Sequence, residues 1–181
     1  MTTKPAVICI DARFWGIKDT GIGRYTENLI DNLPTDKNIK LVLLISPQTA
    51  PVPKLEKYEK YVIRNHPYTL RSFIETHIAL FKIHPNLFHA TNLSIPVLWP
   101  GKIVVTIHDL IKHYSRGLAN TTRSPIIYWL KYLQYLILVN IAIRRASHII
   151  VPANYWKEKI IEKYSINPEK ISVTYEGVFN D

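Results

Sequence analysis

Two runs of consecutive apolar residues, with no alternation of apolar and polar positions, most constrain what this chain can fold into. The runs cover residues 6–10 (AVICI) and 41–45 (LVLLI). A strand that is apolar at every position is covered on both faces, which is the situation of strands in parallel sheets. The sequence therefore predicts a parallel sheet with helices on both sides.

Segments with helical spacing of apolar residues separate the predicted strands. Ile22, Tyr25 and Leu29 recur at intervals of three and four, with Thr20 as N-cap and Pro34 as the stop. Further helices are expected over residues 69–83, 124–146 and 154–164. Further strands are expected at residues 61–63, 87–89, 102–107, 148–151 and 171–174. Strands alternating with helices predict an α/β fold, a doubly wound and mainly parallel sheet.

Length and cysteine content agree with one folded domain. A chain of 181 residues, 47% of them hydrophobic, can remove about 70% of its unfolded surface from water without disulfides or a structural metal. Cys9 is the one cysteine, so disulfide-rich and zinc-binding modules are excluded. The first apolar run is too short for a signal-peptide core, and a cytoplasmic protein is expected.

Positive charge is concentrated in the second half of the chain. The formal net charge is +9, and residues 101–164 carry ten basic and three acidic side chains. A basic surface suits phosphorylated ligands, anionic lipids or nucleic acid, and charge alone does not choose among them. The sequence has no zinc finger, RNP-like aromatic signature or Arg-rich tail, so no nucleic-acid partner is expected.

Residues that directly follow strands are the first candidates for a site, because ligands of such sheets lie beyond the carboxyl ends of the strands. The sequence offers four places: residues 11–13, 89–92, 108–109 and 152–154. An imidazole there can donate to a hydroxyl or move a proton near neutral pH. His89 and His108 are expected to project into one cleft, although either alone would more often be structural. Asp109 either orients His108 or caps the next turn.

A glycine loop precedes the first predicted helix. Gly21 and Gly23 allow a ligand to approach the positive end of that helix, where Arg24 adds charge, although they would equally serve a tight turn. A dinucleotide-binding fingerprint is disfavoured, because Gly21 lies ten positions after Asp11 and Thr26 stands where the third glycine belongs. A nicotinamide oxidoreductase is therefore the weakest hypothesis.

Three blocks occupy nearly the whole chain in order: DARFWGIKDTGIGRYTENLIDNL, FHATNLSIPVLWPGKIVVTIHDLI and ASHIIVPANYWKEKIIEKYSINPEKISVTYEGV. Together they resemble the N-terminal domain of family-4 glycosyltransferases, which have the GT-B fold. In that family two Rossmann-like domains face each other across a cleft. The N-terminal domain mainly binds the acceptor, and the C-terminal domain holds a nucleotide-sugar donor. The resemblance implies retaining transfer of a sugar to a hydroxyl, with no cofactor and usually without a required metal.

The resemblance also implies roles for single residues. Gly21, Gly23 and Arg24 would face the donor diphosphate or the acceptor, His108 would lie against the donor sugar, and His89 and Asn92 would line the acceptor side. The expected site thus contains His108 and Asp109 for catalysis, and Arg13, Gly21, Gly23, Arg24, His89 and Asn92 for donor and acceptor binding. Ala153 and Asn154 replace a Ser-Glu pair that is frequent in the family, which weakens the case for a contact from that helix start.

The resemblance implies that half of the transferase lies outside this sequence. Residues 1–178 would form the acceptor-side domain, and residues 179–181 would begin a linker to a C-terminal donor-binding domain. The donor-binding E-x7-E motif does not occur here, so the chain is expected to be inactive alone. Either the chain is half of a larger enzyme, which is the favoured interpretation, or a partner chain provides the second domain. The alternative to a transferase is a non-catalytic module that recognises an acceptor or a membrane surface.

Residues 125–143 carry one charge, Lys131, and have the length of a membrane span. A span is not expected, because Lys131, Gln134 and Asn140 are costly in lipid and the α/β pattern requires a helix of the sheet here. One face is expected to pack on the sheet: Ile126, Leu130, Leu133, Ile137 and Ile141. Another suits either an anionic membrane on the cytoplasmic side or a protein contact: Tyr128, Lys131, Tyr132 and Tyr135.

Overall fold

One parallel sheet organises the chain, whose computed structural model describes residues 4–16, 20–114 and 124–177. The strands of this described part are β1 (Ala6–Asp11), β2 (Ile39–Ile45), β3 (Glu59–Val62), β4 (Leu87–Ala90), β5 (Lys102–Thr106), β6 (His148–Val151) and β7 (Ile171–Val173). Their order is β3-β2-β1-β4-β5-β6-β7, and every neighbouring pair is parallel. This confirms the predicted doubly wound α/β fold.

The helices begin and end close to the predicted positions. They are α1 (Gly21–Asp31), α2 (Leu70–Ile83), α3 (Ile111–Tyr114), α4 (Pro125–Arg145) and α5 (Asn154–Tyr164), with 3-10 turns at Pro53–Leu55 and Pro168–Lys170. Thr20 caps α1 as predicted, because its hydroxyl accepts a hydrogen bond from the Gly23 N–H at 3.1 Å. The four-residue α3 was not predicted, since one turn of helix is too short to show a period.

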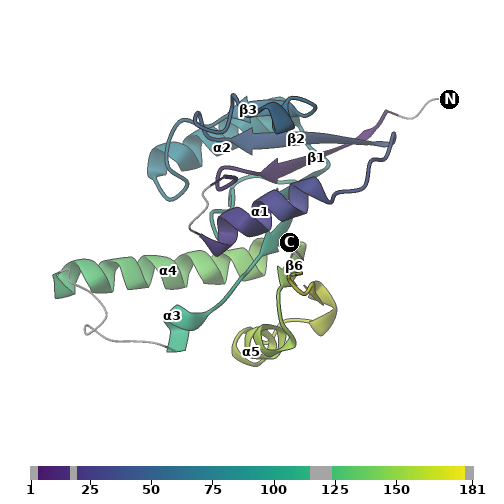
Figure 1. Cartoon of the computed structure of the whole chain (residues 1–181). Coiled ribbons are helices and arrows are strands. Elements are labelled where there is room, and N and C mark those ends of the chain that lie inside the picture. Colours follow the sequence, from purple (N-terminus) through teal and green to yellow (C-terminus); the bar gives the residue numbers. More distant parts are fainter. Residues whose placement is uncertain (1–3, 17–19, 115–123, 178–181) are drawn as a thin grey trace.

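Two apolar clusters lie on opposite faces of the sheet. One includes Cys9 together with buried residues of α2, α4 and α5, such as Leu80 and Ile160. The other includes Ile10 and, from α1, Ile30. Cys9 and Ile10 are neighbours in β1 but belong to different clusters, because successive strand side chains point to opposite faces. Helices α2, α4 and α5 therefore cover one face and α1 the other (Figure 1).

The orientation of α4 differs from the expected one. Its buried residues are Val139, Ala142 and Ile143, all near its C-terminal end, and its N-terminal half projects beyond the sheet (Figure 1). At about 100° per residue, the predicted sheet-facing residues lie on the opposite side of the helix. Ile126, Leu130, Leu133 and Ile137 are accordingly 49–72% exposed, and the prediction that they pack on the sheet is wrong. Ile141, the last residue of the predicted face, does pack against the core.

The tyrosines of α4 lie on the inward side instead. Tyr128, Tyr132 and Tyr135 are half-buried, and the Tyr135 hydroxyl lies 2.9 Å from Nδ1 of His113. Nε2 of His113 in turn lies 2.8 Å from the hydroxyl of Tyr164, which ties α3 to both α4 and α5. The tyrosine face is therefore largely an internal packing surface.

Candidate active site

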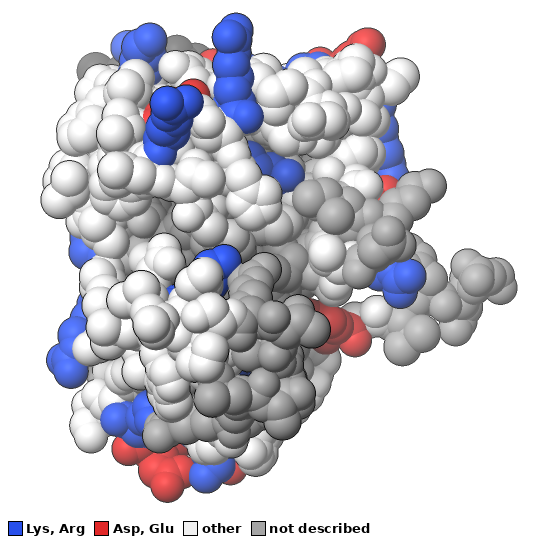
Figure 2. Space-filling model, turned by 90° about the vertical axis from the view of Figure 1, so that its left-hand side faces the viewer, with Lys and Arg blue, Asp and Glu red and all other residues white. Residues whose placement is uncertain are grey.

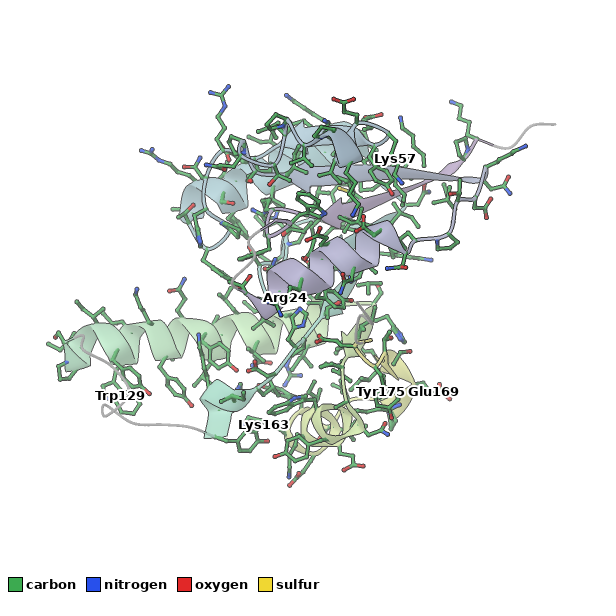
Figure 3. The ribbon with its side chains drawn as sticks, in the orientation of Figure 1. Arg24, Lys57, Trp129, Lys163, Glu169 and Tyr175 are labelled. Atoms are coloured by element: carbon green, nitrogen blue, oxygen red, sulfur yellow. The ribbon has the colours of Figure 1, made fainter. Side chains whose placement is uncertain are left out.

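A cavity of about 510 Å³ opens at the carboxyl edge of the sheet. It is lined by Ile22 from the first turn of α1, Asn92 after β4, His108 after β5 and Lys131 from α4. Figure 3 shows Arg24 at the same end of α1, on the side toward α4. The two parts of the predicted site, the glycine-containing helix start and the histidine after β5, thus meet at one cavity.

His108 is held between two hydrogen-bond acceptors. Its Nε2 lies 3.1 Å from the carbonyl oxygen of Thr91, and its Nδ1 lies 3.3 Å from Oε1 of Glu176. Because both partners are acceptors, both ring nitrogens donate when the two contacts are made together. The His108 side chain is 18% exposed, so the ring is fixed in place yet still reachable from the cavity.

Tyr25 connects α1 to this histidine. Its ring meets the His108 ring edge to face, with centroids 4.7 Å apart. Its hydroxyl lies 3.0 Å from Oγ1 of Thr106, at the end of β5. Burial raises the pKa of Tyr25, with Glu176 adding to the rise and the Thr106 hydrogen bond opposing it. The tyrosine therefore acts as a neutral spacer that sets how close α1 comes to His108.

His89 does not occupy the place expected for it. It lies within β4, not after it, and is buried against the end of β5, where its Nε2 contacts Oγ1 of Thr106 at 2.9 Å. Burial lowers the pKa of His89 to about 4; the charge of Asp11 opposes this shift and His108 adds to it. His89 is thus a neutral residue behind the site, and the expectation that both histidines project into one cleft holds for His108 alone.

Arg13 and Asn92 converge on a buried carboxylate. Arg13 donates through Nε and Nη2 to the two oxygens of Asp11, at 2.7 and 2.5 Å, and through Nη1 to the Ser72 hydroxyl at 2.5 Å. The Asn92 amide donates to Oδ2 of Asp11 at 3.3 Å, and the Thr91 hydroxyl to the Asp11 carbonyl at 2.7 Å. This network joins the ends of β1 and β4, so the cavity wall is rigid where Asn92 lines it.

Asp109 performs the second of the two functions that the sequence left open. Its carboxylate accepts a hydrogen bond from the Ile111 N–H at 3.0 Å and so caps α3. The carboxylate lines the cavity but forms no hydrogen bond with His108. The fourth predicted place, residues 152–154, begins α5, where the Asn154 amide donates to the Tyr175 hydroxyl at 3.0 Å.

Gly21 and Gly23 differ in their exposure and in the space beside them. Gly23 is buried, and its N–H is already bonded to Thr20. Gly21 is exposed, and a Cβ added there would meet no atom within 4 Å. The protein itself therefore gives no steric reason for glycine at Gly21, and the open space beside the first turn can admit a ligand.

Several residues of the cavity were not predicted as site residues. Lys112 and Gln134 line it, as does Lys131, which the sequence had placed on a membrane-facing surface. Lys112 lies over the Tyr135 ring, with Nζ 5.4 Å from the centroid. Glu176, which contacts His108, was also missed. Its position just after the last predicted strand could have identified it. Lysines on helices give no such signal, because solvent-exposed helix faces carry them routinely.

Comparisons with known proteins identify the family of this chain. A family model described as Glycosyltransferase Family 4 matches residues 20–179. Among solved structures, a glycosyltransferase from Rickettsia africae ESF-5 is 15% identical, with a TM-score of 0.47, and the match covers 98% of this chain and 44% of that one. The search of curated proteins gives no significant match. Because the family match spans most of the sequence, the chain belongs to glycosyltransferase family 4.

Proposed function

We propose that the chain is the acceptor-side half of a retaining glycosyltransferase, which transfers a sugar from a nucleotide-sugar to a glycan or a lipid-linked acceptor. The observation that carries the proposal is the cavity where the first turn of α1, His108 and two lysines meet. The chain spans less than half of the Rickettsia glycosyltransferase. From the resemblance to family 4, in which a C-terminal domain holds the donor, we also propose that such a domain supplies most of the donor site and that the chain is inactive without it. Residues 179–181, the proposed linker start, lie outside the described residues.

Sugar transfer requires stabilisation of the departing diphosphate and of positive charge on the sugar ring. The N-terminal end of α1 presents backbone N–H groups and a positive helix end beside open space at Gly21, with Arg24 nearby. We assign the diphosphate to this end. His108 would then contact the donor sugar, because it lines the same cavity and is held by Thr91 and Glu176.

The lysines favour an acceptor that carries negative charge. Lys112 and Lys131 line the cavity, and within the described part of the chain neither forms an ion pair with a carboxylate. Among the described residues of the lining, Asp109 is the one acidic residue. A phosphate or carboxylate on the acceptor would therefore find unneutralised cations opposite the donor end of the cavity.

The test is an assay of nucleotide-sugar turnover by the chain alone and by the chain extended with the sequence encoded after Asp181. The extended protein should hydrolyse or transfer one nucleotide-sugar of a panel, whereas the chain alone should not. In the extended protein, His108→Ala should lower the rate about 100-fold or more while leaving the far-ultraviolet circular dichroism unchanged.

His148→Ala serves as the matched control, because His148 begins β6, away from the cavity, and contacts Ser172. It should keep the wild-type rate. Turnover by the chain alone would disprove its inactivity. An extended protein that binds an acceptor but turns over no nucleotide-sugar would favour the non-catalytic binding module. Equal rates for wild type and His108→Ala would remove His108 from the mechanism.

We also propose a cytoplasmic location. The support is the single cysteine, Cys9, which is buried and free, so the fold makes no use of an oxidising compartment. Localisation of a fluorescent fusion of the extended protein tests this, and a secreted product would contradict it.

A further inference from the structure

The N-terminal half of α4 exposes an apolar stripe along one side of the helix. Ile126, Leu130, Leu133 and Ile137 recur at intervals of four, three and four, and each is at least 49% exposed. Ile127 and Trp129 flank the stripe and are 48% and 51% exposed. Soluble proteins normally cover so long a row of large apolar side chains, so this surface needs a partner.

A second stripe lies on α2, which covers the same face of the sheet. Leu70, Ile74, Ile78 and Phe81 are 48–75% exposed. Phe81 contacts the ring of Trp99 at 5.3 Å, and Trp99 accepts a hydrogen bond from Arg145 at the end of α4. Leu98, which precedes Trp99 and donates its N–H to Nε2 of His77 in α2, is 71% exposed. Two stripes on one face indicate an extended apolar surface; we call the residues of both stripes, with Leu98, the apolar face.

The charged residues of the described segment around α4 are basic. Between Asp109 and Glu158 the described part of the chain has no Asp or Glu but five Lys and Arg residues, and α2 carries Arg71 and Lys82 beside Glu75. Figure 2, which views the molecule from the end toward which α4 projects, shows a largely uncharged surface with Lys and Arg side chains at its top, left-hand edge and right-hand side, and with Asp and Glu side chains at its lower end and right-hand side. Apolar side chains bordered by cations and by aromatic rings such as Trp129 fit the interface of an anionic bilayer.

The helix can lie on such a bilayer but cannot span it in this fold. By length and composition alone α4 would suffice to cross a membrane. However, Val139, Ala142 and Ile143 belong to the core of the sheet. A transmembrane placement would pull these residues out of the protein, whereas a surface placement uses only side chains that are already exposed.

We propose that the apolar face docks on the surface of an anionic membrane, with α4 lying in the plane of the interface. This goes beyond the proposed transfer reaction and does not depend on it. A second copy of the chain is a less suitable occupant, because two such faces would bring their basic borders together. Docking would also hold the cavity at the bilayer surface, since Lys131 and Gln134 line the cavity from the same helix.

Co-sedimentation with vesicles tests the proposal. Vesicles of phosphatidylglycerol and phosphatidylcholine in equal parts are compared with vesicles of phosphatidylcholine alone, and a vesicle-free tube measures self-pelleting. The wild-type chain should bind the anionic vesicles more strongly, and added salt should reduce that preference. The double variant Leu130→Glu with Leu133→Glu should lower the partition coefficient about a hundredfold, because each of the two withdrawn apolar side chains is worth about tenfold.

Ile39→Glu is the matched control. Ile39 is 38% exposed at the start of β2, at the end of the sheet away from the N-terminal half of α4 (Figure 1). It should keep wild-type binding. Equal partitioning of the wild type and the double variant, or no binding by the wild type, would overturn the proposal. If the double variant instead converts a dimer to a monomer in sedimentation velocity without any vesicle binding, the occupant is a second copy.

Discussion

At the scale of single residues, the side chains that support the site already form their hydrogen bonds and ion pairs without a ligand. Asp11 and Arg13 neutralise each other while almost wholly buried, and the attraction of Asp11 raises the pKa of Arg13 despite the opposing effect of burial. Such a pair is costly to break, because the remaining charge would have no partner in the interior. Arg13, expected from the sequence to bind ligand, contacts Asp11 in the structure and so helps to position the Asn92 wall.

Burial of His89 makes the stability of the protein depend on pH. In the unfolded chain the pKa of His89 is about 6.5, whereas in the folded protein it is about 4. Above pH 6.5 both states are neutral and stability is unaffected. As the pH falls from 6.5 toward 4, the unfolded state binds a proton at His89 that the folded state does not bind. The free energy of unfolding therefore falls by up to about 1.4 kcal/mol per pH unit.

Urea unfolding of the wild type and His89→Gln at pH 7, 6 and 5 measures this effect. The variant keeps a partner for Thr106 but cannot titrate in this range, so its stability should fall less between pH 7 and pH 5. The other histidines contribute equally to both proteins and cancel in the difference. Parallel losses of stability in the two proteins would show that His89 is not the cause.

At the scale of elements, the order, type and approximate bounds of strands and helices followed from the sequence, because continuous apolar runs and helical periods are local signals. The orientation of α4 could not be predicted. Ile126, Leu130 and Leu133 form a regular apolar row. Which side of the helix is buried, however, depends on how the C-terminal third of α4 packs on the sheet. Likewise, His89 and His108 were both expected to follow strands. However, β4 continues through His89 to Ala90 and His89 is buried, whereas β5 ends at Thr106, before His108.

Two helices end in a conformation that favours glycine. The caps of α2 and α5 are His84 and Ser165, with φ of 48° and 50°, and both side chains are exposed. His84→Gly and Ser165→Gly should each raise the free energy of unfolding by about 0.5–1 kcal/mol, because glycine adopts this region without strain.

Chemical denaturation measures the change, with Lys82→Gly as the control. Lys82 is exposed in the last turn of α2, where glycine has no conformational advantage and should cost about 1 kcal/mol. A loss of stability at all three positions would mean that the strain at the caps is negligible.

At the scale of the whole molecule, one sheet serves both apolar clusters, and the two faces should therefore unfold together. Leu80→Ala removes a buried side chain from the cluster under α2, and Ile30→Ala removes one from the cluster under α1. Each should cost about 2–5 kcal/mol, because each leaves a cavity against the same strands.

Circular dichroism and tryptophan fluorescence should report one coincident transition for the wild type and both variants, since Trp15 packs against one cluster and Trp99 belongs to the other. Separate transitions, or a variant that shifts one probe and not the other, would mean that the faces are independent units.

The single thiol at the centre of this sheet makes opening of the fold measurable as a chemical rate. Cys9 is fully buried in β1, between β2 and β4, and burial raises the pKa of its thiol, with Asp11 adding to the rise. An alkylating reagent needs the thiolate and therefore has to wait until the strands part. Because no second cysteine competes for the label, the modification rate of the native protein counts openings of the sheet directly. A ligand that closes the cavity between α1 and β5 would lower the modification rate of Cys9. Ligand binding could therefore be followed without knowing the reaction.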